Sequence, residues 1–200
     1  MKMKIVQVGE PVLRQAARPL SAEEIRSAQV QQLIEVMRET MRAAPGVGLA
    51  APQVGLSIQL AVIEDPEEYL KDVSPDVLAR QERSPVPFHV IINPVLHIEP
   101  GEEKVEFFEG CLSLSGFAAI VARARRARVE CLDERGTPLT INASGWYARI
   151  LQHEIDHLGG TVYIDRMHSR SFMSLDNLTR YWKDLPVEQL RDALKLPSIN

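Results

Sequence analysis

His153-Glu154-Ile155-Asp156-His157 places two histidines four positions apart, with a carboxylate directly after the first. On an α-helix, positions four apart lie on one face about a turn apart, so both rings can reach one metal ion. Glu154 then lies beside the ion without binding it. In metal hydrolases such a carboxylate takes a proton from the attacking water and delivers it to the leaving group. The segment therefore predicts a metal-dependent hydrolase.

The neighbouring residues favour a helical site over a chance match, which also occurs in proteins that bind no metal. Ala148 to Gln152 are good helix formers with apolar residues at helical spacing, and Gly159-Gly160 supplies a stop. The segment therefore predicts a short, well-bounded helix that is buried in the fold.

Two histidines leave one protein ligand missing, because a catalytic zinc-like site usually has three. One protease pattern continues to a third histidine; Gly160 matches its glycine, but Tyr163 stands at the histidine position. Cys111 is the next candidate, since a thiolate binds zinc or ferrous iron strongly and Gly110 lets the backbone approach closely. The alternative for Cys111 is a small buried apolar residue. Cys131, in an alternating stretch, is assigned to a strand core.

The stretch from Gly46 to Gly55 resembles a dinucleotide-binding glycine loop at its start. Such a loop follows a strand and precedes a helix, whereas here a predicted helix comes first and Pro52 interrupts any helix that follows. We expect the glycines to let an extended substrate lie against the main chain. Gln53 offers an amide donor suited to an oxyanion site.

Together, the three segments resemble peptide deformylase, the enzyme that removes the formyl group from the N-terminal formyl-methionine of nascent polypeptides. The family motifs Gly-φ-Gly-φ-Ala-Ala-x-Gln-φ-Gly (φ apolar), Glu-Gly-Cys-φ-Ser and His-Glu-x-x-His all occur here in the family's order. The resemblance extends over essentially the whole chain. Phe107 to Cys111 and Asn142 to Trp146 are similar to the organelle-type (1A-like) branch, which also has bacterial members.

The resemblance implies three metal ligands, one general acid and base, two oxyanion donors and a set of substrate-binding residues. The metal it implies is one divalent ion per chain, with Fe²⁺ first and Ni²⁺, Co²⁺ or Zn²⁺ as replacements. By this resemblance, the metal ligands are Cys111, His153 and His157, and the general acid and base is Glu154. The oxyanion donors are Gln53 and the backbone N–H of Leu112. The substrate-binding residues are Val47, Gly48, Gly110, Trp146 and Ile150.

Three positions carry additional expectations. Many family members have an arginine about seven residues after the cysteine, where this chain has Ala118. Arg123 matches a common family arginine and is expected to pair with Glu109, the alternative being a solvated strand residue. Trp146 lies two helical turns before His153, so it either packs in the core or lines the methionine pocket.

Composition agrees with an ordinary globular protein. The 200 residues, 45% hydrophobic and 25% charged, predict a single catalytic domain over residues 1–200. Two cysteines give no disulfide framework. No apolar run is long enough to cross a membrane, and the amino terminus lacks the features of a signal or transit peptide. These observations favour a bacterial cytoplasm, or an organellar enzyme already trimmed.

The expected partners are N-formyl-methionyl nascent peptides and, transiently, the ribosome near its exit tunnel. The net charge of −4 argues against a general nucleic-acid binder. The arginines at 123, 125, 126 and 128 either touch ribosomal RNA or, the favoured alternative, lie on a solvated strand. The oligomeric state is left open between a monomer and a homodimer.

The pattern of elements predicts an α+β fold with mostly antiparallel sheets around a central helix that carries the histidine motif. Helices are expected at Glu23–Ala44, with a Ser21/Glu24 capping box, and at Val187–Leu194 in a tail over about 177–200. A surface insertion with a short helix is expected at about 64–87. Strands are expected at Phe88–Ile98, Val105–Phe108, Ile120–Asp133 and Leu139–Ala143. His89, His97 and His168 are expected to be structural or solvated.

Two other functions share part of the pattern. A metalloendopeptidase would use the same two histidines and Glu154 but need a third ligand other than Cys111. A non-catalytic module stabilised by metal would need a fourth protein ligand, and no further Cys or His is suitably placed in the sequence.

Overall fold

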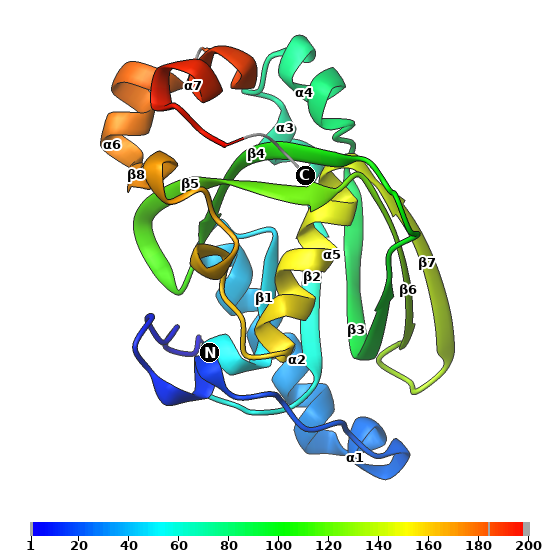
Figure 1. Cartoon of the computed structure of the whole chain (residues 1–200). Helices are drawn as coiled ribbons and strands as arrows, with labels where there is room; N and C mark the ends of the chain where they lie inside the picture. Colours follow the sequence, from blue (N-terminus) through cyan, green and yellow to red (C-terminus); the bar gives the residue numbers. More distant parts are fainter. Residues whose placement is uncertain (1, 184, 198–200) are drawn as a thin grey trace.

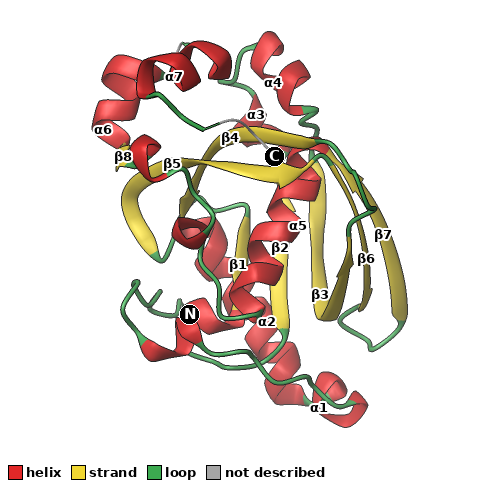
Figure 2. Ribbon diagram, viewed as in Figure 1, coloured by secondary structure: helices red, strands yellow, loops and turns green. Residues whose placement is uncertain are grey.

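The helix that carries the histidine motif, α5 (Gly145–Leu158), packs against strands of two antiparallel sheets (Figure 1). These features belong to a computed structural model that describes residues 2–183 and 185–197. Gly159 follows α5 and Gly160 takes a left-handed φ of 77°, so the helix ends where the glycine pair predicted. The predicted α+β class is confirmed (Figure 2).

The larger sheet has five strands in the order β1-β2-β3-β6-β7, all antiparallel. Alternate residues of β2 serve its two faces: Ala61 and Ile63 join the core cluster that contains α5, whereas Leu60 and Val62 join the cluster that contains α2. The sheet therefore separates two apolar cores. The strands are β1 Gly48–Ala50, β2 Leu60–Asp65, β3 Val86–His97, β6 Arg126–Leu132 and β7 Pro138–Ser144.

The smaller sheet is a hairpin with one short added strand, in the order β4-β5-β8. Its strands are β4 Lys104–Cys111, β5 Leu114–Ala124 and β8 Met173–Ser174. The prediction of one strand from Ile120 to Asp133 is wrong, because the chain bends at Arg125 and passes from this sheet to the larger one. The Arg125 N–H donates to the Glu103 carbonyl at 2.7 Å beside β4, while the Arg125 carbonyl accepts from the Gly145 N–H at 2.8 Å beside β7.

The predicted helix from Glu23 to Ala44 is in fact two helices, α1 (Ala22–Arg26) and α2 (Ala28–Ala43). Ser27 separates them in an extended conformation and its hydroxyl caps α2 by accepting from the Val30 N–H. The Ser21/Glu24 capping box is confirmed.

The remaining helices are short. The region predicted as an insertion contains α3 (Glu67–Leu70) and α4 (Pro75–Gln81). The tail contains α6 (Leu175–Asn177), a π-helical turn at Leu178–Trp182 and α7 (Val187–Leu194), the last as predicted. Residues 184 and 198–200 of that tail lie outside the described residues. Single 3-10 turns occur at Pro11–Arg14, Ala51–Val54, Tyr163–Asp165 and Ser169–Ser171. Among the described residues, no helix combines the length and apolarity that a membrane span requires.

Candidate metal centre and active site

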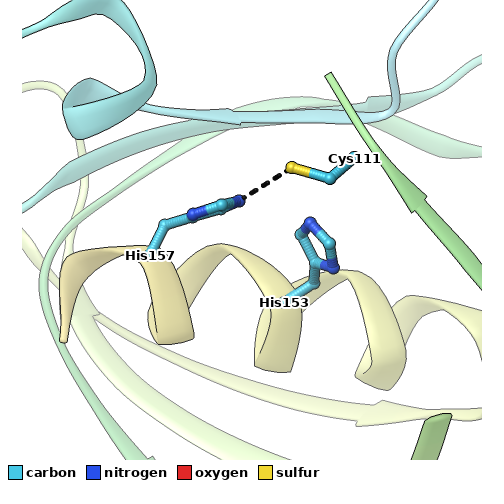
Figure 3. A group of neighbouring side chains, drawn as sticks. All are labelled: Cys111, His153 and His157. Carbon is cyan, nitrogen blue, oxygen red and sulfur yellow. Dashed lines mark hydrogen bonds between the residues drawn. The ribbon is translucent and has the colours of Figure 1, made fainter. Parts of the chain in front are cut away.

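Helix α5 presents both motif histidines to the end of strand β4, where Cys111 lies (Figure 3). Cys111, His153 and His157 each offer one donor atom, and these three atoms all lie within 4.8 Å of one another. The Cys111 Sγ lies 3.2 Å from Nε2 of His157, and the two imidazole rings are 5.0 Å apart at 76°. The three residues predicted as ligands are therefore neighbours in space.

Glu109 orients one of these histidines. Its Oε2 lies 3.0 Å from Nδ1 of His153, which leaves Nε2 as the ring nitrogen available for another bond. The carboxylate also accepts hydrogen bonds from Arg123 at 2.9 and 3.0 Å, so the predicted Arg123–Glu109 pair is confirmed, and from Arg149 at 2.6 Å. Burial alone would raise the pKa of Glu109, but the hydrogen bonds from His153 and Arg123 hold it well below its ordinary value.

These donors fit a divalent transition metal. A thiolate with two imidazoles is a set that iron, nickel, cobalt and zinc all accept. His157 is fully buried, and its Nδ1 has no hydrogen-bond partner among the described residues. Tyr163, at the position where the longer protease pattern needs a histidine, is buried with its ring 6.3 Å from that of His153 and is not part of the ligand group.

Glu154 lies against Gly48 of β1. A Cβ added at Gly48 would come within 2.2 Å of Glu154 Oε1, so only glycine leaves room for this side chain. Glu154 is 4% exposed, its Oε2 has no partner within the described part of the chain, and burial raises its pKa to about 7. A carboxyl group in this state can both accept and release a proton near neutral pH.

Gln53 is held with its amide N–H₂ toward the sulfur. Its Oε1 accepts from the Ala50 N–H at 2.8 Å, which fixes the orientation of the amide. Its Nε2 then lies 3.4 Å from the Cys111 Sγ and 3.3 Å from the Ser113 Oγ. The amide donor therefore lies directly beside the three candidate ligands.

A cavity of about 700 Å³ contains the site. Its volume is in the range of pockets that enclose a drug-sized ligand. Phe117 and Leu175, 41% and 46% exposed, mark its mouth, whereas Glu154 lies deep within it. Gln53 and Leu112 line this cavity. So do all five residues predicted to bind substrate, which are Val47, Gly48, Gly110, Trp146 and Ile150.

The match to known proteins covers most of the chain. The family model for polypeptide deformylase matches residues 2–172. The chain belongs to the polypeptide deformylase family. Enzymes of this family are hydrolases that remove the N-formyl group from nascent peptides, and they need a metal ion.

Relatives come from plants and bacteria. The chain is 46% identical over 183 residues to the chloroplastic peptide deformylase 1A of Solanum lycopersicum, which covers 92% of the chain and 64% of that protein. It is 43% identical over 192 residues to peptide deformylase 3 of Streptomyces avermitilis, and the match covers 96% of this chain and 83% of that protein. A class I type b peptide deformylase from Acinetobacter baumannii, solved with Met-Ala-Ser bound, superposes with a TM-score of 0.73 at 32% identity and covers 84% of this chain and 99% of its own.

Three deformylase-site contacts were not predicted. The sequence analysis paired Glu109 with Arg123 only, and missed its contact with His153. Arg149 was treated as a helix former, yet it lies four residues before His153 and thus on the same helix face, which was a usable signal. Ser113, 1% exposed, contacts Gln53, and its place in Glu-Gly-Cys-φ-Ser was the available hint.

The arginine run carries little free charge. Arg125 pairs with Glu82 and Glu103, while Arg126 pairs with Glu102. Arg128 pairs with Glu130. These partners favour the interpretation as a solvated strand face over an RNA contact. Of the other histidines, His89 contacts the Tyr147 hydroxyl at 2.9 Å, His97 pairs with Glu130 and His168 pairs with Glu106.

Proposed function

We propose that this chain removes the formyl group from N-terminal formyl-methionine, with Cys111, His153 and His157 holding the metal ion. The observation that carries the proposal is that these three donors lie together beside one cavity. Cys111 and His153 line that cavity with the buried carboxylate of Glu154 and the amide of Gln53. A divalent ion held by these donors would polarise the formyl oxygen and lower the pKa of a water molecule.

Glu154 supplies the proton transfers. Its unpartnered oxygen and its pKa of about 7 suit a group that takes a proton from the attacking water and gives it to the departing amine. Both transfers are needed, because an amide nitrogen leaves poorly unless it is protonated. The products are formate and a free methionine amino terminus.

The negative charge that develops on the formyl oxygen is held by Gln53 and the backbone N–H of Leu112. Gln53 is pre-oriented by its hydrogen bond from Ala50, so no reorganisation is needed as the charge forms. Both residues line the cavity beside Cys111.

The methionine side chain occupies the apolar part of the cavity formed by Val47, Trp146 and Ile150. The Acinetobacter relative with bound Met-Ala-Ser supports a peptide that begins with methionine at the corresponding place. Gly48 and Gly110 let the peptide backbone approach the main chain.

The proposal extends to the setting of the reaction. The native ion is ferrous iron, replaceable by nickel, cobalt or zinc, which the donor set supports as a class. The substrate is met during brief encounters with the ribosome near its exit tunnel, in a bacterial cytoplasm. Bacterial relatives such as that of Streptomyces avermitilis support this setting.

The test is formate release from formyl-Met-Ala-Ser by protein purified without oxygen and loaded in turn with ferrous, nickel or cobalt ions. A longer, unformylated peptide that contains Met-Ala-Ser at an internal position serves as the control for endopeptidase activity. We expect formate from the first peptide and no cleavage of the second. Silence with all three ions, or cleavage of the control, contradicts the proposal.

A further inference from the structure

The pair formed by Asp65 and Arg83 lies outside the groups assigned to the reaction but reaches the cavity wall. Asp65, the last residue of β2, has a fully buried side chain. Arg83 donates to it twice, from Nε to Oδ2 and from Nη2 to Oδ1, both at 2.8 Å. The two parallel bonds fix the plane and the position of the guanidinium group.

The same guanidinium lies over the indole ring of Trp146, with Cζ 5.1 Å from the ring centroid. The Arg83 side chain is only 13% exposed, so the cation is partly desolvated and its attraction to the ring is strengthened. Phe107 meets the indole edge-on at 6.3 Å, and Arg149 lies 6.0 Å from the centroid. The indole therefore contacts two cations and one aromatic ring.

The backbone that carries Arg83 is docked on the start of α5. Glu82, directly after α4, has a left-handed φ of 46°, and the Arg83 N–H donates to the Leu78 carbonyl at 2.9 Å. A Cβ added at Gly145 would come within 2.4 Å of the Glu82 Cβ and 2.5 Å of the Gln81 carbonyl oxygen. In Figure 1, α3 and α4 lie at the same end of the molecule as the beginning of α5.

We propose that Arg83, held by Asp65, is a positioning residue that fixes Trp146 and so sets the fit of the cavity to the first side chain of the substrate. The inference rests on the proposed function for its substrate. It gives the segment between β2 and β3 a part in substrate affinity. Arg83 acts through Trp146, so its loss should weaken binding while the chemical step at the metal centre continues.

The single substitution of Arg83 would leave the buried Asp65 charge unpaired and destabilise the fold. The test therefore uses Asp65→Asn/Arg83→Gln, which replaces the ion pair by two neutral amides and leaves no buried charge unpaired. Arg42→Gln/Glu64→Gln is the matched control, because that pair also joins an arginine to β2, at Glu64. Both are made with Trp182→Phe, which leaves Trp146 as the only tryptophan of the two in the chain.

For the test pair we expect KM for formyl-Met-Ala-Ser to rise about tenfold with kcat within about twofold, as the loss of a desolvated cation–π contact predicts. Acrylamide quenching of Trp146 fluorescence should increase, metal content should stay unchanged, and the control pair should match the wild type. Arg83→Lys keeps the charge but loses the two parallel bonds, so its KM and its acrylamide quenching should lie between those of the wild type and those of the test pair. A lowered Tm with unchanged KM and quenching would show a merely structural pair and overturn the inference.

A wild-type protein without deformylase activity would contradict the proposed function but leave the role of Arg83 testable. If the wild type releases no formate, the affinity of Met-Ala-Ser, followed by Trp146 fluorescence, replaces KM as the measurement. Equal peptide affinity and equal quenching in the test pair and the wild type then overturn the inference by themselves.

Discussion

Replacing Gly48 by alanine tests whether the position of Glu154 controls the reaction. The added Cβ would lie 2.2 Å from Oε1, 2.5 Å from Cδ and 2.8 Å from Cγ of Glu154, whereas ordinary contacts begin at 3.4 Å. The carboxylate must therefore retreat by about 1 Å, and a misplacement of that size costs about a hundredfold in rate. Gly48 does not have a left-handed φ, so alanine fits its backbone.

The assay is formate release at saturating formyl-Met-Ala-Ser, with metal content and Tm measured on the same samples. Gly159→Ala is the control, because its Cβ would lie 3.4 Å from the nearest atom at the end of the same helix. We expect Gly48→Ala to retain its metal and lose about a hundredfold in kcat, since only the carboxylate moves. A loss below tenfold at full metal occupancy would refute the reasoning.

Three further substitutions separate the other roles. Cys111→Ser should lower both metal content and activity, because a hydroxyl is not deprotonated as readily as a metal-bound thiol; normal metal content with full activity would remove Cys111 from the ligands. Gln53→Leu should cost about 2.7 to 4 kcal/mol of transition-state stabilisation, measured as kcat at unchanged metal content, and a tenfold or smaller loss would exclude Gln53 from the mechanism. Glu109→Gln should weaken metal affinity by about tenfold to a hundredfold, because His153 loses its charged acceptor; an unchanged affinity in a metal titration would contradict that role.

Elements with local signals could be predicted from the sequence. The helix with the histidine motif has a periodic apolar face and a glycine stop, and α7 matches its predicted bounds. The break at Ser27 was missed because the apolar spacing continues across it, although a serine can also cap a helix. Strand β2 was missed because its apolar run, Leu60 to Ile63, is buried on both faces and shows no alternation.

Features that depend on tertiary contacts could not be read in this way. The bend at Arg125 arises where the chain leaves one sheet for the other, and no turn residue marks it. In the site, the ligand candidates followed from motif spacing and family resemblance. The Glu154 side chain occupies space that only a glycine at position 48 leaves open. These two residues are far apart in the sequence, so only the fold shows why that glycine is needed.

The most direct test of the central claim is Glu154→Gln, measured for metal content and formate release across pH. Glutamine keeps the shape of the side chain but cannot exchange a proton, so the metal should stay bound while formate release nearly stops. Raising the pH supplies more hydroxide but no acid for the leaving amine, so little activity should return. Wild-type turnover at high pH would show that Glu154 acts as a base only, and loss of the metal would make it a ligand.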